Sequence, residues 1–172
     1  MKTLILFAHP AWEKSVANRA LIEAAREVPG VTVRDLYALY PDFFIRAKEE
    51  QAALQEHDRL VWQHPLYWYS TPSLLKEWMD VVLEYGWAYG EGGDALRGKT
   101  LTSVVTAGGS KEVYCEAGRN RFSVAEFLRP CEQTARLCGM TYGEPIVFYE
   151  ALELDLKAAV ETYGNWLRND GI

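Results

Sequence analysis

The segment from His9 to Asn18 carries residue types suited to holding an anionic group. A short apolar run ends at His9–Pro10, and Ser15 stands where a helical spacing of apolar residues begins. Serine is a preferred helix N-cap, and the first turn of a helix offers free N–H groups and a partial positive charge, which suit a phosphate. The segment has no glycine and no Gly-Lys-Ser/Thr sequence, so it is not a P-loop. Taken alone, Ser15 is better explained as a simple cap.

A metal site is the alternative interpretation of His9–Pro10. Zinc deacetylases that begin with Ala-His-Pro-Asp-Asp have a similar motif, but Ala11 and Trp12 replace both aspartates here. The chain has only three histidines, and no two of them have the spacing of ligands on one helix. The sequence therefore predicts no metal.

Three consecutive aromatic residues, Tyr67, Trp68 and Tyr69, follow the apolar run that ends at His64–Pro65. A planar ring with polar edges would fit an aromatic wall and loop N–H groups. The alternative is an aromatic surface that becomes buried at a dimer contact, where such residues are also enriched. Both interpretations remain open.

A third segment, residues 106–110, contains the pair Gly108–Gly109. Paired glycines let a backbone approach a ligand closely and expose N–H donors, although an ordinary turn also explains them. Three such segments at one end of a sheet are a stronger signal than any one of them.

The elements that must position these segments are strands alternating with helices. Strands are expected at residues 4–8, 31–36, 59–63, 101–106 and 145–148, helices at 15–30, 49–56, 71–82, 122–138 and 154–167, and a long loop at 86–98. This order predicts an α/β domain spanning residues 1–172, with a five-stranded parallel sheet, right-handed crossovers and a ligand beyond the carboxyl ends of the strands.

Composition narrows the function classes. The 18 basic and 24 acidic residues give a net charge of −6, and no basic cluster is visible, which argues against nucleic-acid binding. The apolar run after Met1–Lys2 is too short for a signal peptide, and no segment approaches the length of a membrane span. Three cysteines without Cys-x-x-Cys spacing fit a reduced compartment, so a cytoplasmic location is expected.

Taken together, the three segments resemble the NAD(P)H:quinone oxidoreductase family of flavodoxin-like proteins. The resemblance spans nearly the whole chain and rests on Ala8–His9–Pro10 with Ser15-x-x-Asn18, on Pro65–Leu66–Tyr67–Trp68–Tyr69 with Leu74–Leu75–Lys76-x-Trp78, and on Thr106-x-Gly108–Gly109–Ser110. Residues 39–43, 62–65 and 86–93 look closest to the ancillary proteins of glutathione-regulated potassium-efflux systems (KefF/KefG type).

The resemblance implies a doubly wound sheet of order 2-1-3-4-5 with helices on both faces, FMN as cofactor and a homodimer. FAD is less favoured, because the chain lacks the C-terminal extension of larger relatives. Carried over to this chain, the FMN site comprises His9, Ser15, Val16, Ala17, Asn18, Leu66, Tyr67, Trp68, Tyr69, Thr106, Ala107, Gly108 and Gly109. The substrate pocket comprises Trp87, Tyr89, Tyr114 and Asn120. Of these, Trp87 and Tyr89 would help to form the pocket of the partner subunit.

The implied activity is two-electron transfer from NADPH or NADH through flavin N5 to a quinone, by a ping-pong mechanism. Gly108 and Gly109 would stabilise charge at flavin N1 and O2, and Tyr114 would stand at the same edge. The chain departs from the family pattern at Asn120, where the better-known enzymes have a histidine. An amide cannot relay a proton at neutral pH, which places a Tyr–His relay in doubt.

Two other functions are alternatives. A regulatory subunit would dock on the cytoplasmic domain of a potassium-efflux antiporter, peripheral to the inner membrane, with or without reductase activity. An electron-transfer flavodoxin usually has a Thr/Ser-rich, Gly-containing first loop, which residues 9–15 do not match. The sequence leaves the physiological quinone or electrophile and the choice between NADH and NADPH open.

Overall fold

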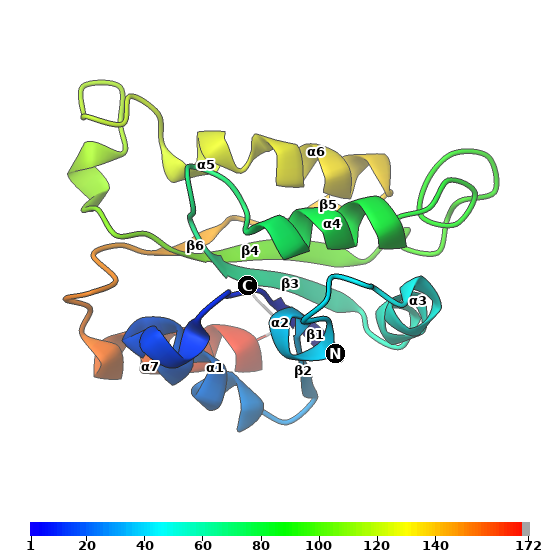
Figure 1. The fold of residues 1–172 in the computed structure, drawn as a ribbon, viewed down its shortest axis with the longest axis horizontal. Helices are drawn as coiled ribbons and strands as arrows, with labels where there is room; N and C mark the ends of the chain where they lie inside the picture. Colours follow the sequence, from blue (N-terminus) through cyan, green and yellow to red (C-terminus); the bar gives the residue numbers. More distant parts are fainter. Residues whose placement is uncertain (170–172) are drawn as a thin grey trace.

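A parallel β-sheet runs through the centre of the molecule, and helices cover both of its faces (Figure 1). The computed structural model describes residues 1–169. The strands are β1 (Thr3–Phe7), β2 (Val31–Asp35), β3 (Arg59–Pro65), β4 (Thr100–Thr106), β5 (Thr141–Tyr142) and β6 (Ile146–Phe148). Their order is β2-β1-β3-β4-β5, with every pair parallel, so the predicted 2-1-3-4-5 topology is confirmed.

The last position of the sheet is shared by two short strands rather than the single strand predicted at 145–148. β5 pairs with the start of β4, and β6 pairs with its end. Between them the Gly143 amide donates to the carbonyl of Leu101 over 2.8 Å, while Pro145 has no N–H to add to the ladder. The sheet therefore has six strands in five positions.

The helices are α1 (Val16–Arg26), α2 (Leu36–Leu39), α3 (Ala47–Gln55), α4 (Ser73–Val82), α5 (Val124–Phe127), α6 (Arg129–Leu137) and α7 (Leu156–Arg168). Single 3₁₀ turns, η1 (Trp12–Lys14) and η2 (Lys111–Val113), follow β1 and β4. α1 and α7 pack on one face, whereas α3, α4 and α6 lie over the other (Figure 1). Successive residues of β1 alternate between the two buried apolar clusters, as a strand covered on both sides must.

Helix boundaries follow from capping. Ser15 caps α1 as predicted, since its Oγ accepts a hydrogen bond from the Asn18 amide. The single helix predicted at 122–138 is divided at Leu128, and Pro130 stands in the first turn of α6, where its missing N–H costs nothing. α4 begins at Ser73, after its N-cap residue Pro72, rather than at residue 71 as predicted.

A buried carboxylate holds α2, α3 and α4 together. Glu50 in α3 is fully buried and accepts hydrogen bonds from Arg34 Nε (3.0 Å), Trp78 Nε1 (2.9 Å) and the Tyr40 hydroxyl. Burial, and to a smaller extent the neighbouring Glu50 carboxylate, raises the pKa of Tyr40. The Tyr40 hydroxyl therefore keeps its proton. This ion pair fixes the side of the molecule opposite α1 and α7.

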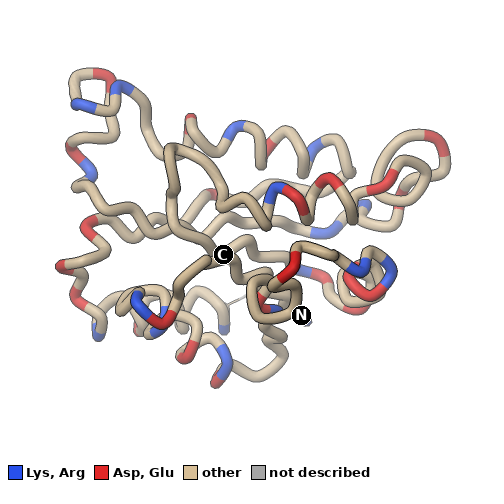
Figure 2. Tube along the Cα trace, viewed as in Figure 1, with Lys and Arg blue, Asp and Glu red and all other residues tan. Residues whose placement is uncertain are grey.

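Charge is distributed without a one-sign face in the view of Figure 2, where Lys and Arg alternate with Asp and Glu along the helices. None of the helices within residues 1–169 is long and apolar enough to cross a membrane. Cys131 and Cys138 are buried and Cys115 is exposed, and none of the three is in a disulfide.

Candidate functional site

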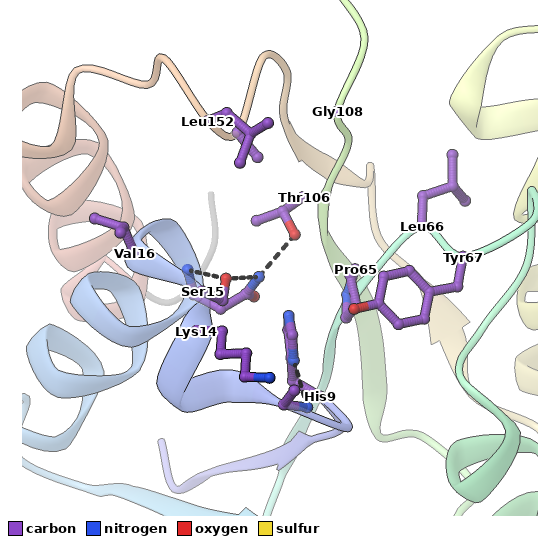
Figure 3. Close-up of a pocket in the computed structure, with 13 residues that line it drawn as sticks. His9, Lys14, Ser15, Val16, Pro65, Leu66, Tyr67, Thr106, Gly108 and Leu152 are labelled. Carbon is purple, nitrogen blue, oxygen red and sulfur yellow. Dashed lines mark hydrogen bonds between the residues drawn. The ribbon is translucent and has the colours of Figure 1, made fainter.

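The carboxyl ends of β1, β3 and β4 open onto a cavity of about 460 Å³ (Figure 3). It is lined by His9, Ala11, Lys14, Ser15, Val16, Asn18, Pro65, Leu66, Tyr67, Thr106, Gly108, Ala151 and Leu152. The structure thus brings the three predicted segments to one place, as the topology of a parallel sheet requires.

The start of α1 forms one wall of the cavity. Ser15 Oγ accepts from the Asn18 amide (3.3 Å), while the amides of Val16 and Ala17 precede any helical acceptor and donate to no other group within residues 1–169. The Ala17 side chain is buried beneath the helix, so this residue faces a ligand only through its backbone. Free N–H groups at this end of α1 suit a negatively charged ligand.

His9 presents a single hydrogen-bond donor to the cavity. Its Nδ1 accepts a hydrogen bond from the Ala11 amide over 3.1 Å, which assigns the proton of the neutral ring to Nε2. Burial lowers the pKa of His9, an effect that the charge of Glu13 only partly offsets. The ring is therefore neutral at pH 7 and stands upright beside Pro65 with its outer nitrogen toward the cavity (Figure 3).

Asn18 joins two of the three segments. Its Nδ2 donates to Ser15 Oγ (3.1 Å) and to Thr106 Oγ1 (2.8 Å), as the dashed lines in Figure 3 show. Its Oδ1 is buried and accepts no hydrogen bond within the described chain. A buried acceptor without a partner is costly, and here it belongs to a residue that lines the cavity.

The glycine pair after β4 divides into two roles. A Cβ placed on Gly108 would meet no atom within 4 Å, and its amide donates to no group in residues 1–169. A Cβ on Gly109 would lie 2.8 Å from Val113 and 3.3 Å from Tyr114. Gly108 therefore borders open space, whereas Gly109 permits close packing of the following turn. Ala107 is buried, with its N–H donating to Phe148 and its carbonyl accepting from Ala151.

The aromatic segment forms a tight turn with strained backbone. Tyr67 and Ser70 exchange hydrogen bonds between their amides and carbonyls (3.1 and 3.0 Å), and the two central residues, Trp68 and Tyr69, have φ values of 48° and 62°. Side chains other than glycine rarely adopt this conformation. The Trp68 side chain is 92% exposed. Tyr67 lines the cavity, whereas Trp68 and Tyr69 border a smaller hollow beside it. Backbone strain of this kind clusters at ligand-binding sites.

Tyr114 and Asn120 lie in the loop after η2, next to this turn. Tyr114 borders a smaller hollow of about 200 Å³ with Leu66, Trp68 and Tyr69, and the Tyr69 hydroxyl donates to Asn120 Oδ1 over 3.3 Å. Burial, with a smaller contribution from Tyr69, raises the pKa of Tyr114. Tyr114 is therefore protonated at neutral pH and available as a donor.

Trp87 and Tyr89 lie away from the cavity of their own chain. They belong to the connection that leads from α4 to the start of β4, at the opposite end of the sheet (Figure 1). Tyr89 borders a separate hollow between α4 and α6. Within one chain these two residues do not meet Tyr114.

Several cavity residues were not predicted from the sequence. Lys14 adds a cation, and Ala151 and Leu152 come from the segment after β6, held by hydrogen bonds from the Glu150 amide to Gly109 and from the Ala151 amide to Ala107. Leu152 has no sequence signature, because nothing in its neighbourhood distinguishes it from an ordinary loop. Lys14 directly precedes the Ser15 cap, and this position next to a predicted anion site could have identified it as a candidate.

The residues present fit a phosphorylated, ring-containing cofactor better than a metal. Free amides and Lys14 gather at one wall, the unpaired Asn18 Oδ1 offers an acceptor, and open space lies against Gly108. Within residues 1–169 no group of three His, Cys, Asp or Glu side chains is arranged to hold a metal ion.

Comparison with known proteins agrees with this geometry. The sequence model of the flavodoxin-like fold matches residues 1–168. The chain is 47% identical over 171 residues to the glutathione-regulated potassium-efflux system ancillary protein KefG of Erwinia tasmaniensis, covering 98% of this chain and 93% of that protein. The resemblance expected from the motifs is confirmed.

Two solved structures are also similar. General stress protein 14 of Treponema denticola, in complex with FMN, is 41% identical, covers 98% of this chain and 99% of its own, and superposes with a TM-score of 0.93. An NADPH-quinone reductase from P. pentosaceus is 31% identical, with the same coverage and a TM-score of 0.90.

Proposed function

The chain belongs to the flavodoxin-like fold family, and from that premise we propose that it binds FMN in the cavity beyond β1, β3 and β4 and transfers a hydride from NADPH or NADH to a quinone. The observation that carries the proposal is the convergence of phosphate-type donors, an aromatic turn and a glycine segment on one cavity. The related protein solved with FMN adds independent support.

At one wall, this chain's residues bind the phosphate and sugar portion. The amides of Val16 and Ala17 donate to phosphate oxygens, and the Nε2–H of neutral His9 adds a further donor. Asn18 Oδ1 accepts from a sugar hydroxyl, which satisfies the acceptor left unpaired within the chain. The Asn18–Thr106 hydrogen bond fixes the position of Asn18 for this contact.

At the other wall, Leu66 and Tyr67 in the cavity, with Trp68 and Tyr69 in the adjoining hollow, would hold the planar ring, and Gly108 would let the backbone approach it. When bound, FMN supplies the hydride acceptor and donor that no side chain can provide. The free Gly108 amide would stabilise negative charge on the bound ring. Tyr114, protonated at neutral pH, supplies a hydrogen-bond donor beside that edge, and Asn120 orients Tyr69 without relaying a proton.

A homodimer completes the substrate pocket in this proposal. Trp87 and Tyr89 lie at the end of the sheet opposite the cavity of their own chain. They can therefore contribute to a substrate pocket only if a second copy brings them to it. Trp68 and Phe122 are exposed aromatic residues of the kind that a second copy would bury.

A second function is favoured by one observation, the 47% identity to an ancillary protein of a glutathione-regulated potassium-efflux system. In that role the protein docks on the cytoplasmic domain of an antiporter, peripheral to the inner membrane, with or without reductase activity. The two functions are compatible.

The two half-reactions test the enzymatic proposal. Anaerobic NADPH or NADH should bleach the absorbance of the FMN-loaded protein, and a soluble quinone should restore it. Steady-state rates at several quinone concentrations should give parallel double-reciprocal lines, because one pocket serves both substrates in turn. A protein that holds FMN but is not reduced by either nucleotide would contradict the enzymatic proposal and leave the ancillary role standing.

A further inference from the structure

Lys14 is the one basic side chain among the cavity residues, and no acidic residue lines the cavity. It ends η1, where its amide donates to Ala11 (3.1 Å) and the Ser15 amide donates to Trp12 (2.9 Å). The turn therefore fixes the Lys14 backbone directly before the helix cap. In Figure 3 its side chain extends away from Ser15, and its ammonium group lies beside the base of the His9 side chain.

The Lys14 ammonium group is not committed elsewhere. Every salt bridge within residues 1–169 joins other side chains, and Lys14 makes no side-chain hydrogen bond there. It lies on the same wall as the free amides of α1, next to a histidine that is neutral at pH 7. Lys14 is therefore the only full positive charge available to an anion at this wall.

The opposite rim offers no such charge. Val16 (57% exposed) and Leu152 (96% exposed) border the cavity on the other side of Ser15, with apolar side chains. A phosphate monoester near Ser15 would have a cation on one side and apolar groups on the other. A second phosphate and a nucleoside extending past this rim would gain no charged partner from the cavity residues.

On the basis of the proposed function, we infer that Lys14 is the residue that selects a terminal phosphate monoester, so that FMN binds in preference to riboflavin and FAD. A phosphate monoester carries a charge of between −1.5 and −2 at pH 7, and an ammonium–phosphate hydrogen bond is among the stronger polar contacts. Riboflavin has the same ring and sugar without this charge. The discrimination between the two flavins isolates the contribution of Lys14.

The test is equilibrium titration of the apoprotein with riboflavin, FMN and FAD, in the wild type and in Lys14→Met, Lys14→Arg and Lys157→Met. We expect Lys14→Met to weaken FMN binding about tenfold and to leave riboflavin binding within about twofold, because only the phosphate contact is lost. Lys14→Arg should retain the preference. Lys157→Met, which removes an exposed charge from α7, controls for net charge. The FMN affinity of the wild type should also fall more steeply with added NaCl than that of Lys14→Met.

The outcomes separate this inference from the proposed function. Tight FMN binding with an unchanged FMN-to-riboflavin ratio in Lys14→Met would overturn the role of Lys14 and leave the flavin site standing. Equal losses of FMN affinity in Lys14→Met and Lys157→Met would also overturn it, since they would indicate a general effect of net charge. A wild type that binds none of the three flavins would overturn the proposed function and, with it, this inference.

Discussion

Asn18 Nδ2 donates a hydrogen bond to Thr106 Oγ1 over 2.8 Å, joining the first turn of α1 to the last residue of β4. Eighty-eight residues separate the two in sequence, and both side chains line the cavity. The same amide group also contacts Ser15 Oγ. The buried Asn18 side chain therefore links the start of α1, with its free amides, to the end of β4, which leads into the glycine pair.

Replacing Thr106 by valine removes this hydrogen bond with little change in shape. We expect the free energy of unfolding of the apoprotein to fall by about 1 kcal/mol, the usual value of a buried neutral hydrogen bond, and FMN to bind more weakly. Urea unfolding and FMN titration measure the two effects. Thr141→Val, at an exposed position in β5, is the control and should change neither quantity. A Thr106→Val protein as stable as the wild type would contradict the linking role.

The buried Glu50 should matter far more to stability than its neighbour. Glu50→Gln leaves Arg34 without its charged partner and should lower the free energy of unfolding by about 3 kcal/mol, as breaking a buried ion pair does. Glu49→Gln, which breaks an exposed pair with Arg46, should cost less than about 1 kcal/mol. Equal effects in urea unfolding would show that the buried cluster does not hold α2, α3 and α4 together.

His64 gives a prediction about pH. It is fully buried, its Nδ1 donates to the Pro65 carbonyl (2.9 Å), and burial lowers its pKa to about 4. The unfolded chain takes up this proton near pH 6.5, before the folded protein does, so stability is highest above pH 6.5 and falls as the pH decreases. Between pH 7.5 and 5 the wild type should lose about 2 kcal/mol relative to His64→Gln. A pH-independent difference between the two proteins would contradict the prediction.

Trp68 should show opposite effects on binding and stability. Its positive φ is unfavourable for tryptophan and acceptable for asparagine, and its side chain makes little contact with the rest of the chain. Trp68→Asn should therefore keep the melting temperature at or above that of the wild type while FMN binds about tenfold more weakly, because ring stacking is lost. Phe44→Asn, an exposed aromatic residue outside the cavity, is the control. Unchanged FMN affinity in Trp68→Asn would remove this residue from the proposed site.

Much of the fold was predictable because its signals are local and strong. The apolar runs of β1 and β3 are buried on both faces, and Ser15 caps α1 as its chemistry suggests. The short elements were missed for the opposite reason. Strand β5 has two residues and α2 has four, which is too short for any periodicity to appear. The division of the helix at Leu128 was also missed, although Pro130, two residues later, favours a helix start there.

The site was predictable to the extent that its residues adjoin strand ends. His9, Leu66 and Thr106 lie at or next to strand ends, which the topology brings together, whereas Asn18 was expected from the resemblance that includes Ser15-x-x-Asn18. Leu152 was not predictable, because it reaches the cavity through backbone hydrogen bonds from Glu150 and Ala151 to the glycine segment. Contacts of this kind use groups that every residue has, and so they leave no mark in the sequence.

FMN titration of the wild type and Gly108→Val tests the central claim most directly. A side chain at Gly108 meets no protein atom within 4 Å, so valine should leave the far-UV circular dichroism and melting temperature unchanged while it occupies space next to the cavity. The account predicts that the wild type binds one FMN per chain at micromolar concentration or below and that Gly108→Val binds it at least tenfold more weakly. A wild type that retains no FMN, or a folded Gly108→Val that binds FMN as tightly as the wild type, would contradict it.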